Sequence, residues 1–176
     1  MLHSAIRLNA TDILALAVEK AVDLNLPDGN NFKKMTLLQL AVNLDRIEAV
    51  NILLEHGAEV NTVLDSSPMG SPLYIAAQAR ASARFIPKLL QHGADPNHPH
   101  DRASNSSALA SAISAQADLC TICDLSRAGA AANTAQGGTL TPLSAAVEAG
   151  ATEVVRLLLV HGAESNSPLT DTNIDL

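Results

Sequence analysis

One nine-residue phrase recurs along the chain and constrains the fold more than any other feature. At 53–61, 89–97 and 158–166 it reads Leu-Leu, one variable residue, His-Gly-Ala, two variable residues and Asn. A weakened copy at 125–133 keeps the Gly-Ala and the Asn, and a fainter one ends at Asn25. From Asn61 onward the closing Asn residues are spaced by 36, 36 and 33 positions. Periods of this length indicate a stack of small units, each packed only on its neighbours.

A second phrase precedes each strong or weakened copy. It begins with Ser or Thr, often continues with Pro, and then becomes rich in Leu and Ala, at 36–42, 71–77, 107–113 and 141–147. A Ser or Thr hydroxyl caps the free N–H groups of a helix start, and Pro suits the first helical position. The Leu-Leu pair then lies in a second helix, which ends at Gly. The sequence therefore predicts two short helices in each unit.

Together these phrases resemble the ankyrin repeat, whose signature is Thr-Pro-Leu-His, Ala-Ala, Leu-Leu and Gly-Ala-Asp-x-Asn at a period of about 33 residues. The resemblance implies an all-α fold, an ankyrin-repeat solenoid of helix-turn-helix repeats with hairpin-like connecting loops. We place a degenerate N-terminal capping repeat first, then four repeats, of which the third is degenerate, then a tail: 1–25, 26–61, 62–97, 98–133, 134–166 and 167–176. The tail opens like another repeat and then stops, so it forms either a short cap or a disordered end. The alternative fold is a helical bundle with accidental similarity.

The chain departs from the family pattern in two respects. The opening His is absent, and Gln39, Tyr74, Ala110 and Ser144 stand in its place. Pro87 falls inside the expected second helix of its repeat, where it should remove a hydrogen bond and bend the helix.

Composition excludes several classes of function. The net charge of −7 argues against binding to phosphate backbones, and three aromatic residues cannot build a stacking platform for nucleic acid. No apolar stretch is long enough to span a bilayer, and 1–10 does not resemble a secretory signal. We expect a cytoplasmic protein, or one delivered into a host cell if it is a bacterial effector.

In ankyrin proteins, binding uses loop tips and the exposed side of the first helices, which the resemblance carries over to this chain. The loops 26–35, 62–70 and 98–106 are two or three residues longer than the one before Thr141. The candidate contacts in or beside them are Lys33, Lys34, Asp65, Ser66, Met69, His100 and Arg102. Those in or after the first helices are Asn43, Tyr74, Gln78, Arg80 and Glu148. As alternatives, long surface loops are tolerated at little cost, and Tyr74 is equally a packing residue.

Other chemistry is weakly supported. Cys120 and Cys123 form a CxxC inside a predicted second helix, where we expect buried, inert thiols; a thiol- or metal-dependent activity at this pair is the alternative function. His98 and His100 are the further candidates for a metal or small-molecule site. His56, His92 and His161 share one repeat position, which predicts a hydrogen bond near a helix end. We predict no catalytic residue, no cofactor and no metal.

The favoured function is a non-catalytic protein–protein interaction module that masks, tethers or inhibits one partner. An adaptor or inhibitor fits this description, as does a bacterial effector or immunity-type protein. The acidic net charge suits a partner with a basic surface. We expect a monomer when the protein is free, with self-association as the alternative.

Overall fold

The computed structural model describes residues 2–20, 23–25, 35–64, 70–79, 82–98, 107–133 and 141–165. These ranges contain ten α-helices, one 3-10 helix and no strand. The helices are α1 (Leu2–Arg7), α2 (Thr11–Glu19), α3 (Leu37–Asn43), α4 (Ile47–Glu55), α5 (Pro72–Gln78), η1 (Ser82–Phe85), α6 (Ile86–Gln91), α7 (Ala108–Ser114), α8 (Leu119–Arg127), α9 (Pro142–Glu148) and α10 (Thr152–Val160).

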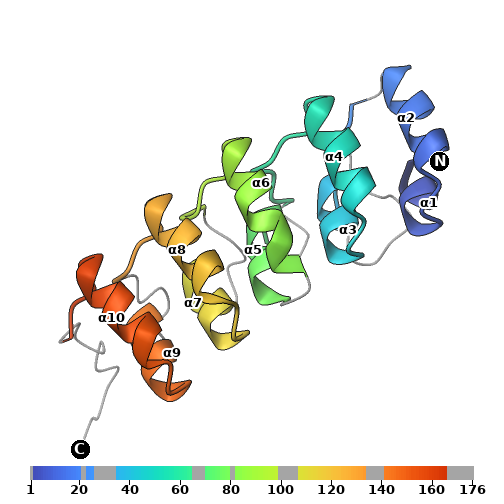
Figure 1. Ribbon diagram of the computed structural model, residues 1–176. Helices are drawn as coiled ribbons and strands as arrows, with labels where there is room; N and C mark the ends of the chain where they lie inside the picture. Colours follow the sequence, from blue (N-terminus) through green and yellow to red (C-terminus); the bar gives the residue numbers. More distant parts are fainter. Residues whose placement is uncertain are drawn as a thin grey trace, which may run out of the picture.

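The helices form five pairs stacked in a single row, from α1–α2 at one end to α9–α10 at the other (Figure 1). Each first helix contacts the first helix of the next pair, and the second helices α6, α8 and α10 contact one another in turn. The all-α solenoid of helix pairs expected from the sequence is confirmed. The boundaries we assigned to individual repeats stay predictions.

The first helices start as their opening phrases predicted. Thr36, Ser71, Ser107 and Thr141 are the N-cap residues of α3, α5, α7 and α9, and each side chain accepts a hydrogen bond from the backbone N–H three residues later. Pro72 and Pro142 are the first residues of their helices, where the missing N–H removes no intrahelical bond. The local sequence thus fixes where each first helix begins.

Three of the second helices, α4, α6 and α10, end at the His-Gly pairs. Nδ1 of His56, His92 and His161 is hydrogen-bonded to the carbonyl oxygen four residues earlier, at 2.8–2.9 Å. The next residue is a glycine with positive φ, 84° at Gly93, which suits the left-handed end of a helix. The predicted hydrogen bond near the helix end is confirmed.

The closing Asn residues join each pair to the next. Nδ2 of Asn97 donates to the Gly129 carbonyl at 2.8 Å, and its Oδ1 accepts from the Ala131 N–H at 2.8 Å. Asn61 makes the same two bonds to Gly93 and Asp95. Asn133 makes them to Gly162 and Glu164. The sequence showed the repeated Asn, but its partners lie about 30 residues away and only the stack reveals them.

Gln39 takes the place of the family's opening His and is fully buried. Its Oε1 accepts from the Thr36 N–H at 2.8 Å, while Nε2 donates to the carbonyls of Thr62 at 3.3 Å and Gly70 at 2.6 Å. One amide thus caps its own helix and holds both ends of the segment 62–70. This substitution therefore keeps the opening phrase joined to the next repeat.

The prediction that Pro87 bends its helix is wrong. The second helix of that repeat starts at Ile86, so Pro87 occupies its first turn, and the 3-10 helix η1 takes up the chain before it. An N–H in the first turn of a helix has no intrahelical acceptor, so proline loses nothing there. The consequence is a second helix of six residues, where α4 and α8 have nine.

Candidate binding surface

The last residue of every first helix is exposed and points away from the core. These residues are Arg7, Asn43, Gln78, Ser114 and Glu148, and we call them the helix-end row. Because the five first helices lie side by side, the row carries one side chain from each pair (Figure 1). Its members differ in charge and size while the helices that carry them share one geometry.

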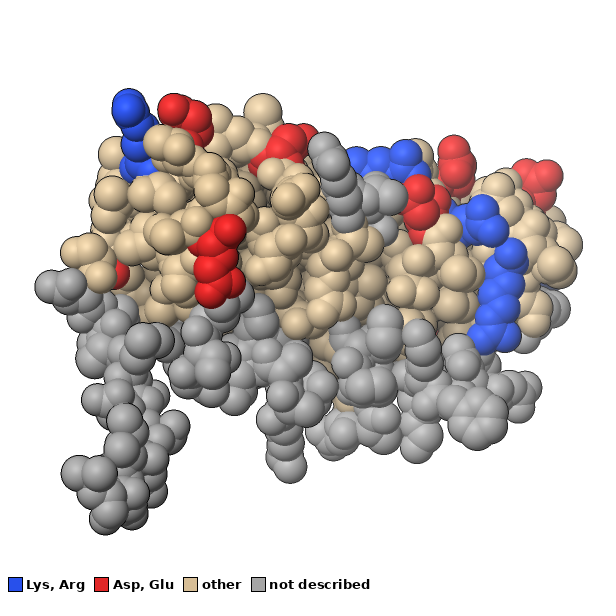
Figure 2. Space-filling view, turned by 90° about the horizontal axis from the view of Figure 1, so that it is seen from below, with Lys and Arg blue, Asp and Glu red and all other residues tan. Residues whose placement is uncertain are grey.

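The row is basic at its α1 end and acidic at its α9 end. Arg7 opens it, and Nη2 of Arg46 donates to the Arg7 carbonyl at 3.4 Å. Glu148 closes it, followed by the exposed Glu153 in the first turn of α10. Figure 2 views the stack from below and shows blue and red side chains together on the right. Several red side chains and a blue one also lie in the left half of the view (Figure 2).

An ion pair crosses two repeats beside the basic end. Nη2 of Arg84, in η1, lies 2.5 Å from Oδ2 of Asp45, in the turn after α3. The Arg84 guanidinium also lies 5.4 Å from the centroid of the Phe85 ring. Both partners of the ion pair are between a third and a half exposed, so their attraction is weakened by solvent. The ion pair orients two charged side chains between the second and third helix pairs of the stack.

The structure brings three of the predicted contact residues onto the row, namely Asn43, Gln78 and Glu148. Tyr74 differs, because only 4% of it is exposed and it packs within the stack. We therefore leave Tyr74 out of the surface proposed below. The other candidates lie outside the described residues: Lys33, Lys34, Asp65, Ser66, Met69, Arg80, His100 and Arg102.

The sequence reasoning missed Arg7, Asp45, Arg46 and Arg84. Arg7 lies in the degenerate N-terminal repeat, where no opening phrase indicated a first helix. The others lie in or after the turn that follows a first helix, a place where we searched only for the residues directly after the Ala-Ala pair. The register itself would have found Arg7, because it lies 36 residues before Asn43.

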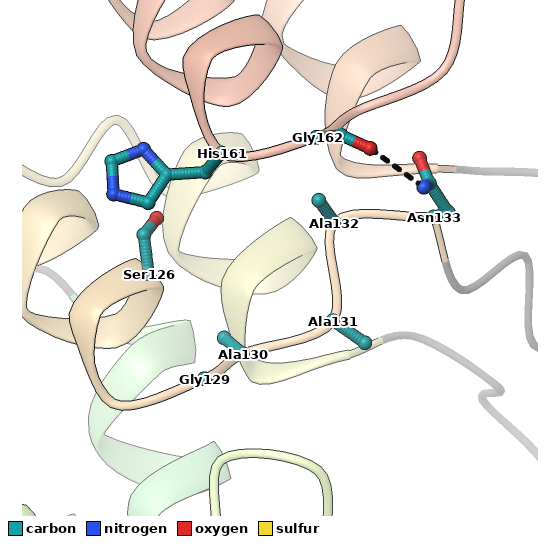
Figure 3. Close-up of a pocket in the computed structure, with 8 residues that line it drawn as sticks. All are labelled: Ser126, Gly129, Ala130, Ala131, Ala132, Asn133, His161 and Gly162. Carbon is teal, nitrogen blue, oxygen red and sulfur yellow. Dashed lines mark hydrogen bonds between the residues drawn. The ribbon is translucent and has the colours of Figure 1, made fainter.

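A shallow hollow of about 510 Å³ lies between the ends of α8 and α10, as Figure 3 shows. It is lined by Ser126, Gly129, Ala130, Ala131, Ala132, Asn133, His161 and Gly162. Ser126 stands in the repeat position that Leu54 and Leu90 fill in earlier copies, and Ala131 and Ala132 stand where Asp95 and Pro96 do. The hollow therefore arises from small residues in the degenerate third repeat. Its polar lining is largely engaged, since Ser126 Oγ donates to the Ile122 carbonyl at 2.8 Å.

The cysteine pair is not buried as expected. Cys120 is exposed and Cys123 is half-buried, and neither forms a disulfide. The buried side of α8 runs through Thr121, Ile122, Leu125 and Ser126, which places Cys120 on the opposite side. Within the described ranges no three His, Cys, Asp or Glu side chains gather as a metal site would require. His98 is described and half-buried, whereas His100 is not among the described residues.

Comparison with known families matches the Ankyrin repeat at residues 33–65 and again at 140–169. No curated protein matches the chain. Among the described helices, none combines the length and hydropathy that crossing a membrane requires. The two matched segments include the α3–α4 and α9–α10 pairs, and like pairs fill the stack between them. The chain therefore contains ankyrin repeats at 33–65 and 140–169, within a stack of like helix pairs.

Proposed function

We propose that this chain binds one protein partner through the helix-end row and thereby masks, tethers or inhibits that partner. Ankyrin repeats generally mediate protein–protein interaction and are typically non-catalytic. The observation that carries the proposal is the row itself, a line of five exposed and dissimilar side chains on one repeated backbone.

The row suits recognition because its backbone is held firmly. Four of the five helices that carry it begin at a side-chain N-cap, and the Asn bonds join neighbouring pairs. A surface that is already ordered loses less conformational entropy when a partner binds. Its side chains also supply polar contacts of different kinds, which favours one partner over others.

The charged side chains on the helix-end row and beside it indicate how a partner would lie. Glu148 and Glu153 would face basic side chains, whereas Arg7 and Arg46 would face acidic or carbonyl groups. With a net charge of −7 on the chain, a predominantly basic partner surface is favoured over an acidic one. We place the complex in the cytoplasm, or in a host cell if the chain is a bacterial effector.

The test compares two double variants that change the same residue types. Gln78→Arg with Glu148→Arg alters the helix-end row, and Gln91→Arg with Glu55→Arg alters the far ends of two second helices. All four residues are exposed, and the two variants change the net charge equally. Each is used as bait in cell extract beside the unaltered chain, and captured proteins are quantified by mass spectrometry.

We expect the row variant to lose a partner that the unaltered chain and the second-helix variant both retain. For that partner, a purified complex should show at least about a tenfold rise in Kd, which corresponds to about 1.4 kcal/mol. Equal capture by all three baits would show that the row is not the contact surface. Both variants should keep the helical circular dichroism of the unaltered chain, because no core residue changes.

A further inference from the structure

The α9–α10 end of the stack leaves uncovered two apolar positions that are covered in earlier repeats. Val147 is 63% exposed, whereas Val42, Ala77 and Ile113, at the same repeat position, are buried. Leu159 is 48% exposed, whereas its counterparts Leu54 and Ser126 are buried and Leu90 is half-buried. At each earlier junction the first helix of the next pair contacts the first helix before it. Within the described part of the chain, the end face of α9–α10 therefore has the form of one side of an inter-repeat contact.

The α1–α2 end shows the opposite side of the same contact. Ile13 is 52% exposed, whereas its counterparts Ala49, Phe85, Thr121 and Val154 are buried. Leu16 is 62% exposed, whereas its counterparts Ile52, Lys88, Asp124 and Leu157 are at least half-buried. The first pair thus presents an apolar face of the kind that covers Val42 and Leu54 inside the stack.

We propose that the two ends of this chain bind each other between copies, so that the α1–α2 pair of a second copy stacks on the α9–α10 pair of the first. The occupant is a repeat-shaped helix pair because the end face continues the contact that joins α3–α4 to α5–η1–α6. Burying Val147, Leu159, Ile13 and Leu16 together removes apolar surface from water and supplies the driving force.

This association is head-to-tail, so it does not close after two copies and gives an open row or a ring. It differs from the monomer expected from the sequence and does not depend on the proposed partner. In such an assembly the helix-end rows of successive copies would follow one another, which would present one partner site per copy along a longer surface.

Three double variants of the full chain test the proposal. Ile13→Lys with Leu16→Lys blocks the first end, and Val147→Lys with Leu159→Lys blocks the last end. Ile47→Lys with Leu119→Lys is the matched control. These residues are 38% and 43% exposed, but they lie on α4 and α8, in the interior of the stack and away from its two ends. The mass of each protein is followed by sedimentation velocity over a wide range of concentration. Circular dichroism checks that each variant is folded.

The unaltered chain and the control should both gain mass as concentration rises, whereas each blocked variant alone should stay monomeric. An equimolar mixture of the two blocked variants should form a complex of twice the monomer mass and no larger, because one free first end meets one free last end. The proposal would be overturned if the unaltered chain stayed monomeric at every concentration, or if the two blocked variants did not pair when mixed. Dimers of the first-end variant alone would indicate contact between two last ends and would equally overturn it. None of these outcomes bears on the helix-end row, whose residues are unchanged.

Discussion

At the scale of single residues, asparagine and glutamine amides connect neighbouring repeats. An amide both donates and accepts, so one Asn side chain satisfies a carbonyl and an N–H of the following loop at once. Asn61, Asn97 and Asn133 each do this within the described stack. Such bonds are individually modest in water, but the same pair of bonds recurs at three successive junctions and fixes the register of one helix pair on the next.

Replacing Asn97 by Ala should destabilise the chain by about 1–2 kcal/mol, because two hydrogen bonds between neighbouring repeats are lost. Urea unfolding followed by circular dichroism measures the effect. Asn43→Ala is the control, since Asn43 is exposed at the end of α3, and should change the free energy of unfolding by less than about 0.5 kcal/mol. Equal effects of the two substitutions would contradict the role given to Asn97.

At the scale of helices, the effect of a proline depends on where its helix begins. Pro87, Cys123 and Asn51 share one repeat position. In α6 this position falls in the first turn, whereas in α8 it is the fifth residue of the helix. The same residue type is therefore compatible with one repeat and incompatible with another, although their sequences align.

Cys123→Pro should cost about 3 kcal/mol or more, because proline in the interior of α8 removes a backbone bond and clashes with the preceding turn. Pro87→Ala should lower stability by no more than about 1 kcal/mol, mainly by making the unfolded chain less restricted. Chemical denaturation of both variants gives the comparison. If Pro87→Ala instead stabilised the chain strongly, Pro87 would be straining the helix after all.

At the scale of the whole molecule, stability is a sum over repeats and the junctions between them. The junction between α7–α8 and α9–α10 is incompletely filled, because Ser126 and three alanines line its hollow. The charge of the helix-end row also changes sign from the first repeat to the last. These are properties of the row of pairs and of no single repeat.

Ser126→Leu should fill part of the hollow and stabilise the chain by about 1 kcal/mol. The gain is the apolar area that leucine buries, worth about 1.5–3 kcal/mol, less the hydrogen bond that Ser126 donates to Ile122. Ser126→Ala is the control that loses the bond without filling the space, and it should not stabilise. Thermal unfolding of the three proteins measures this, and a destabilised leucine variant would show that the hollow is too open to bury it.

The sequence alone determined the solenoid, the starts of the first helices, the ends of the second helices at His-Gly pairs, and three members of the helix-end row. Each of these depends on contacts within a few residues, such as the cap from Thr36 or the bond from His92, or on a repeated pattern. Only the stack decided that Tyr74 and Gln39 are buried, that Cys120 is exposed and that Arg84 pairs with Asp45. The stack also determines that apolar residues at equivalent repeat positions are buried in the middle of the stack and exposed at its two ends. The physical reason is that the burial of these residues depends on the neighbouring repeat, which lies more than thirty residues away in the chain. The described part of the chain has no helix pair beyond α1–α2 or α9–α10.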